Sequence, residues 1–149
     1  MPTVEVTFTP LPAHVRTARL VATAVARRSG VDEALMDEVR LAVGEACSRA
    51  VEAHRQHCPA EPIRIEMTDA GERFVVTVSD HAPTSTGTAN GNTSAAAHAT
   101  EIAHEDDGGD VIPAGFGLAV ISGLADDVHV SSTSAGVSVR MSWPAAVTL

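Results

Sequence analysis

Lysine and tyrosine are absent from this chain of 149 residues, and aromatic residues make up only 3% of it. The ten basic residues are all arginine, they are spread along the sequence, and the net charge is −9. Nonspecific binding to nucleic acid needs clustered positive charge, and binding to single strands also uses aromatic side chains that stack on bases. We therefore expect no direct nucleic-acid partner.

No stretch approaches the roughly 20 consecutive apolar residues that span a bilayer. Residues 1–5 lack the basic segment that precedes the apolar part of a signal peptide. We expect a cytoplasmic protein with no membrane partner.

Cysteine is also scarce, and Cys47 and Cys58 lie eleven residues apart in one predicted helix. That separation is about 16 Å of helical rise, which no undistorted disulfide can bridge, so we expect two thiols. His54, His57 and Cys58 offer too few ligands for a structural zinc site, and no second pair stands at a suitable spacing. We expect no zinc or other structural metal.

The hydrophobic pattern predicts one domain over residues 1–149. Alternation of apolar and polar residues predicts strands at 4–9, 63–67, 74–78, 127–131 and 136–141. Apolar residues spaced three and four positions apart predict helices at 13–28, about 32–57 and 115–124. Residues 82 to about 111 show no such period and predict a flexible lid loop. The order predicts an α+β fold, a two-layer sandwich of a largely antiparallel sheet with helices on one face. The other face should be partly solvated or used for pairing.

Three segments stand in an informative order: Leu41 to Glu52 on the long helix, Val78 to Asp80 at a strand end, and Gly115 to Ile121 after the loop. Together they resemble the nucleotide-binding boxes of the GHKL (Bergerat-fold) ATPases. They are most similar to the anti-sigma-factor serine kinases of bacterial partner-switching systems. The resemblance covers nearly the whole chain and implies a histidine kinase-like ATPase domain.

In that family the first box reads Glu-x-x-x-Asn. The resemblance makes Glu45 the catalytic base, but Arg49 stands at the position of the asparagine that holds magnesium. Mg²⁺ needs oxygen ligands, whereas a guanidinium has five donors and no acceptor, so Arg49 can at best contact a phosphate. Glu45 and Arg49 also have the i, i+4 spacing of a helix ion pair, which we favour over a working catalytic site.

The second box is altered as well. The resemblance assigns Asp80 to the adenine amino group, yet Ala82 and Thr84 replace the two glycines that should follow it. A Cβ at both positions, with proline between them, disfavours tight or positive-φ geometry. Asp80 can still accept a hydrogen bond from adenine, or it can simply cap a turn.

The third box is intact. Gly115, Gly117 and Leu118 would place backbone N–H groups at a helix N-terminus where a phosphate can bind. The same glycines are equally suited to close packing of a helix start on the sheet. The resemblance thus makes Arg49, Asp80 and this segment the candidate nucleotide contacts.

The resemblance implies a regulator of transcription that sequesters a sigma factor and is released by a STAS-type anti-sigma antagonist. Kinase-competent relatives phosphorylate a serine of that antagonist with ATP and Mg²⁺. Here the altered boxes predict weak or lost ATP binding and impaired catalysis, with an active ATP-dependent serine kinase as the alternative. By the same resemblance, Arg16 and Arg19 on the first helix are candidate partner contacts, unless they form a solvated face, and a homodimer through the sheet is expected.

Overall fold

The structure, a computed structural model, describes residues 2–82 and 114–146. Its elements are β1 (Thr3–Phe8), α1 (Pro12–Ser29), the 3-10 turn η1 (Glu33–Leu35), α2 (Met36–His57), β2 (Ile63–Asp69), β3 (Arg73–Ser79), α4 (Ala114–Leu124), β4 (Asp127–Thr133) and β5 (Gly136–Pro144). Apart from Ala82, the predicted lid falls at residues outside those described.

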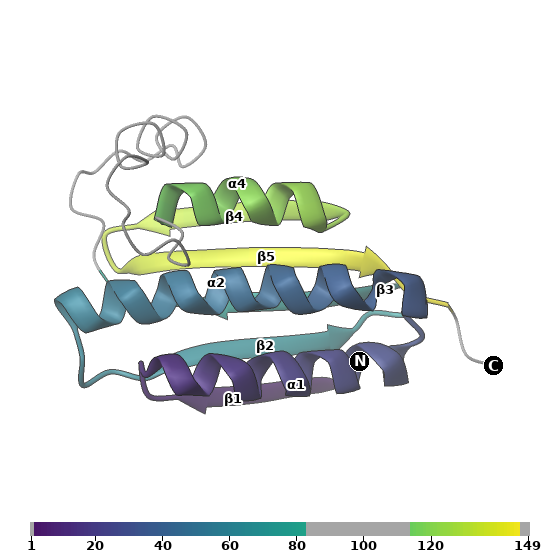
Figure 1. Ribbon diagram of the computed structural model, residues 1–149, viewed down its shortest axis with the longest axis horizontal. Helices are drawn as coiled ribbons and strands as arrows, with labels where there is room; N and C mark the ends of the chain where they lie inside the picture. Colours follow the sequence, from purple (N-terminus) through teal and green to yellow (C-terminus); the bar gives the residue numbers. More distant parts are fainter. Residues whose placement is uncertain (1, 83–113, 147–149) are drawn as a thin grey trace.

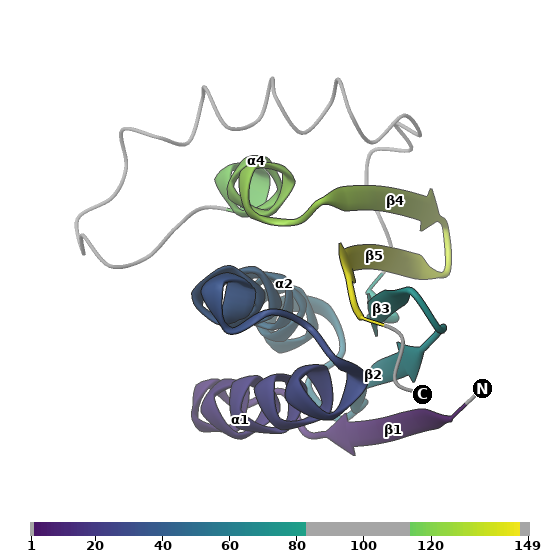
Figure 2. The same ribbon diagram turned by 90° about the vertical axis from the view of Figure 1, so that its right-hand side faces the viewer.

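The five strands form one sheet in the order β1-β2-β3-β5-β4, and every neighbouring pair is antiparallel. Among the described residues, α1, α2 and α4 lie side by side in a second layer on one face of this sheet, with α2 between α1 and α4 (Figures 1 and 2). The predicted α+β sandwich, with an antiparallel sheet and helices on one face, is confirmed.

The core lies between the two layers because each strand alternates apolar and polar residues. Alternate side chains of β2, β3 and β5 are buried under the helices, and α2 buries a stripe along most of its length; the largest buried side chains include Trp143, Phe74, Ile63, Ile65, Met67, Val39 and Val43. The opposite face carries polar side chains such as Arg64, Thr77 and Arg140. The predicted homodimer through the sheet stays a prediction.

The helix ends follow local signals. Pro12 stands in the first turn of α1, and Gly30, with φ 94°, ends the helix by donating its N–H to the carbonyls of Ala26 and Arg27. Asp32 caps η1 by accepting a hydrogen bond from the Ala34 N–H. The predicted second helix therefore starts with a 3-10 turn before α2.

Both cysteines are free thiols, although Cys58 follows the end of α2 instead of lying within it. Burial raises the pKa of the Cys47 thiol to about 12, as fits a small core residue. Within residues 2–82 and 114–146, no helix is both long and apolar enough to cross a membrane.

Candidate functional site

Arg49 on α2 forms an ion pair with Asp80, the residue that follows β3. The guanidinium NH1 donates to Asp80 Oδ2 over 3.1 Å, and the side chains are only 15% and 2% exposed. The predicted pair of Arg49 with Glu45 is therefore wrong. The reason is electrostatic: a buried carboxylate requires a compensating charge far more than a half-exposed one does.

The other carboxylate oxygen of Asp80 is also occupied. Oδ1 accepts hydrogen bonds from the backbone N–H groups of Ala82, at 3.0 Å, and Val137, at 3.2 Å. The Asp80 N–H in turn donates to the Val137 carbonyl at 2.9 Å. Asp80 thus caps the turn after β3, as one of the two interpretations predicted, and it links that turn to β5.

Gly136, at the start of β5, makes this arrangement possible. Its φ is +147°, and a Cβ added to it would lie 2.0 Å from the carbonyl oxygen of Asp80. No side chain fits there. Sequence reasoning passed over Gly136 because a glycine in a hairpin turn gives no sign that another segment lies against it.

His54 links the last turn of α2 to the same region. Its Nε2 lies 2.8 Å from the His81 backbone N–H, and its Nδ1 lies 2.8 Å from the Glu61 carbonyl. Because Nε2 must accept, Nδ1 carries the proton, and the neutral imidazole joins two backbone segments. Among the described residues, no group of three His, Cys, Asp or Glu side chains is arranged to hold a metal ion. The position of His54 on the apolar stripe of α2, four residues after Ala50, is the signal that could have identified it as a core residue.

Glu45 lies one turn before Arg49 and is half-buried. Burial raises the pKa of its carboxyl group, although the nearby Arg19 opposes this shift. Arg19 reaches from α1 across Gly44, where an added Cβ would lie 2.8 Å from the Arg19 Cδ. Within the part of the chain that the structure describes, Glu45 has neither a hydrogen bond nor an ion pair.

The remaining predicted residues lie on α1 and α4. Gly115, Gly117 and Leu118 are in the first turns of α4, whose helical state confirms the predicted element. Arg16 is exposed on α1, whereas Arg19 is half-buried against α2. The structure thus brings Arg49 and Asp80 together, with Glu45 one turn away and Arg16 on the outer surface.

Residues 8–143 match the histidine kinase-like ATPase domain, and the chain belongs to this family. The fold resembles the crystal structure of the RsbU and RsbW domains of Rv1364c from Mycobacterium tuberculosis, with a TM-score of 0.63 and 16% sequence identity. That match covers 100% of this chain and 35% of the other, so this chain spans about a third of the length of that protein. No curated protein matches the sequence.

Proposed function

We propose that the protein is a partner-binding regulator of the anti-sigma-factor type, in which ATP binding is weak or lost. It would sequester a sigma factor and release it when a STAS-type antagonist competes. Membership of the histidine kinase-like ATPase domain family and the fold shared with a structure containing an RsbW domain support the partner-switching part of this proposal.

The ion pair between Arg49 and Asp80 is the observation that carries the loss of ATP binding. An aspartate that binds the adenine amino group needs an accessible acceptor site, but the Asp80 side chain is 2% exposed and both of its oxygens already accept hydrogen bonds within the protein. Separating a buried ion pair costs about 3–5 kcal/mol. A ligand that has to separate the pair in order to bind therefore loses affinity by about a hundredfold or more. A nucleotide site with a micromolar dissociation constant would then have one close to millimolar.

Arg49 also does not fit a magnesium-bound triphosphate. It stands where the family's metal ligand would be, it offers no acceptor atom, and its guanidinium is already paired with Asp80. The residues present thus favour an internal ion pair over a bound Mg²⁺ nucleotide, and we derive no phosphoryl-transfer step.

Glu45 favours the second candidate function, an ATP-dependent serine kinase that modifies the antagonist. Its carboxyl is half-buried, its pKa is raised, and Arg49 does not pair with it. These are properties of a general base. A kinase would still require another group to hold the metal and a route for adenine past Arg49.

Isothermal titration with ATP, with and without Mg²⁺, tests the proposal directly. We expect no heat of binding from the unmodified protein. The Arg49→Asn variant removes the ion-pair partner of Asp80 and places an amide oxygen, an acceptor, at position 49. This is the variant in which ATP binding should recover. Arg55→Asn is the matched control, because Arg55 is an exposed arginine of the same helix, and it should also give no heat.

Magnesium-dependent micromolar binding by the unmodified protein would contradict the proposal. Transfer of the γ-phosphate to a co-purified antagonist, abolished by Glu45→Ala, would then establish the kinase.

Charge reversal at Arg16 tests the partner surface. Arg16 and Leu20 are four residues apart on α1, and Leu20 is 62% exposed, so the two present a mixed basic and apolar face. We expect Arg16→Glu to weaken capture of a co-expressed sigma factor by about tenfold, because it replaces attraction by repulsion. The circular dichroism melt should not change.

The control for Arg16→Glu is Arg140→Glu, which makes the same charge change on the exposed face of the sheet. It should leave capture intact. Equal capture by the Arg16 variant and the unmodified protein would remove α1 from the proposed interface.

A further inference from the structure

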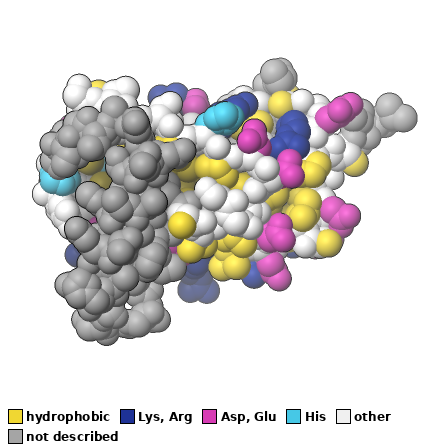
Figure 3. Space-filling view, turned by 90° about the horizontal axis from the view of Figure 1, so that it is seen from above, with side chains coloured by type: hydrophobic (Ala, Val, Ile, Leu, Met, Phe, Trp, Pro, Cys, Tyr) yellow, Lys and Arg dark blue, Asp and Glu magenta, His cyan; other side chains and the backbone are white. Residues whose placement is uncertain are grey.

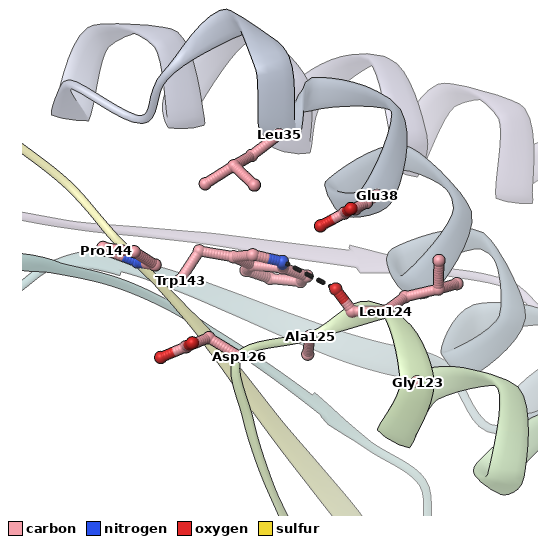
Figure 4. A pocket seen from close by; sticks show the side chains of 8 residues that line it. All are labelled: Leu35, Glu38, Gly123, Leu124, Ala125, Asp126, Trp143 and Pro144. Atoms are coloured by element: carbon pink, nitrogen blue, oxygen red, sulfur yellow. Dashed lines mark hydrogen bonds between the residues drawn. The ribbon is translucent and has the colours of Figure 1, made fainter.

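A cavity lies at the end of the sheet remote from Asp80. Asp80 follows the last residue of β3, whereas Trp143, which lines the cavity, pairs with Phe74 near the first. Seven strand residues separate the two ends by about 20 Å. The cavity has a volume of about 240 Å³, and Figure 4 shows its lining residues, which are Leu35, Glu38, Gly123, Leu124, Ala125, Asp126, Trp143 and Pro144.

The walls of the cavity are partly apolar and partly polar, and they are held in place. Leu35, Leu124 and Pro144 surround the indole of Trp143, which is 1% exposed and donates from Nε1 to the Leu124 carbonyl at 3.2 Å. Sites for drug-sized molecules usually measure roughly 300–1,000 Å³. The smaller volume here suits a single side chain.

The charged side chains of the cavity, Glu38 and Asp126, are both carboxylates. The Glu38 side chain projects from α2 toward the indole and the Leu124 carbonyl (Figure 4). Asp126 is already paired with Arg73 over 2.8 Å, but Glu38 has no ion pair or hydrogen bond to any residue in the described ranges. One carboxylate of the lining therefore lacks a counter-charge among the described residues.

The surroundings are mainly acidic. Toward the right-hand end in Figure 3, acidic side chains, with basic ones among them, lie around a group of apolar ones, and the whole chain carries a net charge of −9. A carboxylate or phosphate group would be repelled there. A wholly apolar side chain would cover Glu38 without pairing it, at the cost of desolvating a charge.

We propose that this cavity binds the arginine or lysine side chain of a partner protein. The alkyl part of such a side chain packs against apolar surface while its charged end stays with polar groups. Here the alkyl part would contact Leu35 and Pro144 beside the buried indole, and the cation would meet the Glu38 carboxylate and the Leu124 carbonyl. This site goes beyond the proposed function, since it depends on neither the nucleotide nor the pair of Arg49 and Asp80.

The only tryptophan of the chain is Trp143, so its indole N–H signal in an NMR spectrum reports on the cavity alone. Acetyl-Gly-Arg-Gly-amide should shift this signal in a saturable way. The same peptide with citrulline, the neutral isostere of arginine, should not. Raising the salt concentration from about 0.01 M to 1 M should weaken binding, because it shortens the screening length from about 30 Å to 3 Å.

Glu38→Gln removes the charge with almost no change of shape and should weaken binding of the arginine peptide by about fivefold. Glu52→Gln is the control, since Glu52 is an exposed glutamate near the other end of α2. Its binding should equal that of the unmodified protein.

Three results would overturn the proposal. An equal shift with the citrulline peptide would show that the cavity does not recognise the positive charge. A shift that depends on protein concentration without peptide, together with dimers in light scattering, would show that a second copy covers it. No shift with either peptide would mean that no basic side chain binds. None of these results bears on ATP titration, so the two proposals fail separately.

Discussion

Gly136→Ala should destabilise the protein by roughly 3 kcal/mol or more, one of the two largest effects we expect of any single substitution. The new Cβ would lie 2.0 Å from the Asp80 carbonyl oxygen, and φ +147° is itself unfavourable for alanine. The strands at this point must separate, and the hydrogen bonds between Asp80 and Val137 would be strained. Urea denaturation followed by circular dichroism measures the loss.

Gly71 supplies the matched control. It also has a positive φ, +85°, but a Cβ there would meet no atom within 4 Å. Gly71→Ala should therefore cost only the backbone term, about 1 kcal/mol. Equal losses for the two variants would show that the contact between Gly136 and Asp80 carries no energy of its own.

Asp80→Ala should destabilise the protein by about 3–5 kcal/mol. The substitution leaves the Arg49 guanidinium buried without its counter-charge and removes the acceptor for the N–H groups of Ala82 and Val137. Most of this penalty arises from the unpaired charge. Adding Arg49→Leu to Asp80→Ala should therefore recover part of the stability, and a double-mutant cycle in urea measures the coupling.

The exposed pair of Arg40 and Asp37, also on α2, is the comparison. Its side chains are 47% and 77% exposed, so breaking it by Asp37→Ala should cost at most about 1 kcal/mol. If Asp80→Ala behaved like Asp37→Ala, the buried pair would contribute little to the fold. Separating the pair would then cost a nucleotide little, and its presence would not weaken ATP binding.

The elements of the fold were predictable because their signals are local. Apolar and polar residues alternate along residues 74–78, and apolar residues recur every three or four positions from Val39 to Val51. Both patterns can be read from a short segment of the chain. Gly30 ends α1 because glycine readily adopts the left-handed conformation found there, and its residue type alone indicates this. The resemblance also groups Glu45, Arg49 and Asp80 from residue type and motif order alone.

The contacts within that group were not predictable in the same way. The i, i+4 rule pairs Arg49 with Glu45 because it considers only one helix, whereas Asp80 lies 31 residues further along the chain. The cavity around Trp143 is assembled from η1, α2, α4 and β5, and no segment alone indicates it.

The sequence by itself determined the order of strands and helices along the chain, the placement of helices on one face of the sheet and the substitutions in the nucleotide boxes. These follow from hydrophobic period, capping residues and residue type, which act over a few positions. Only the tertiary structure decided that Arg49 compensates Asp80, that Gly136 must lack a side chain, and that Glu38 faces Trp143. The reason is that burial sets the cost of a charge or a Cβ, and burial is known only once distant segments have packed.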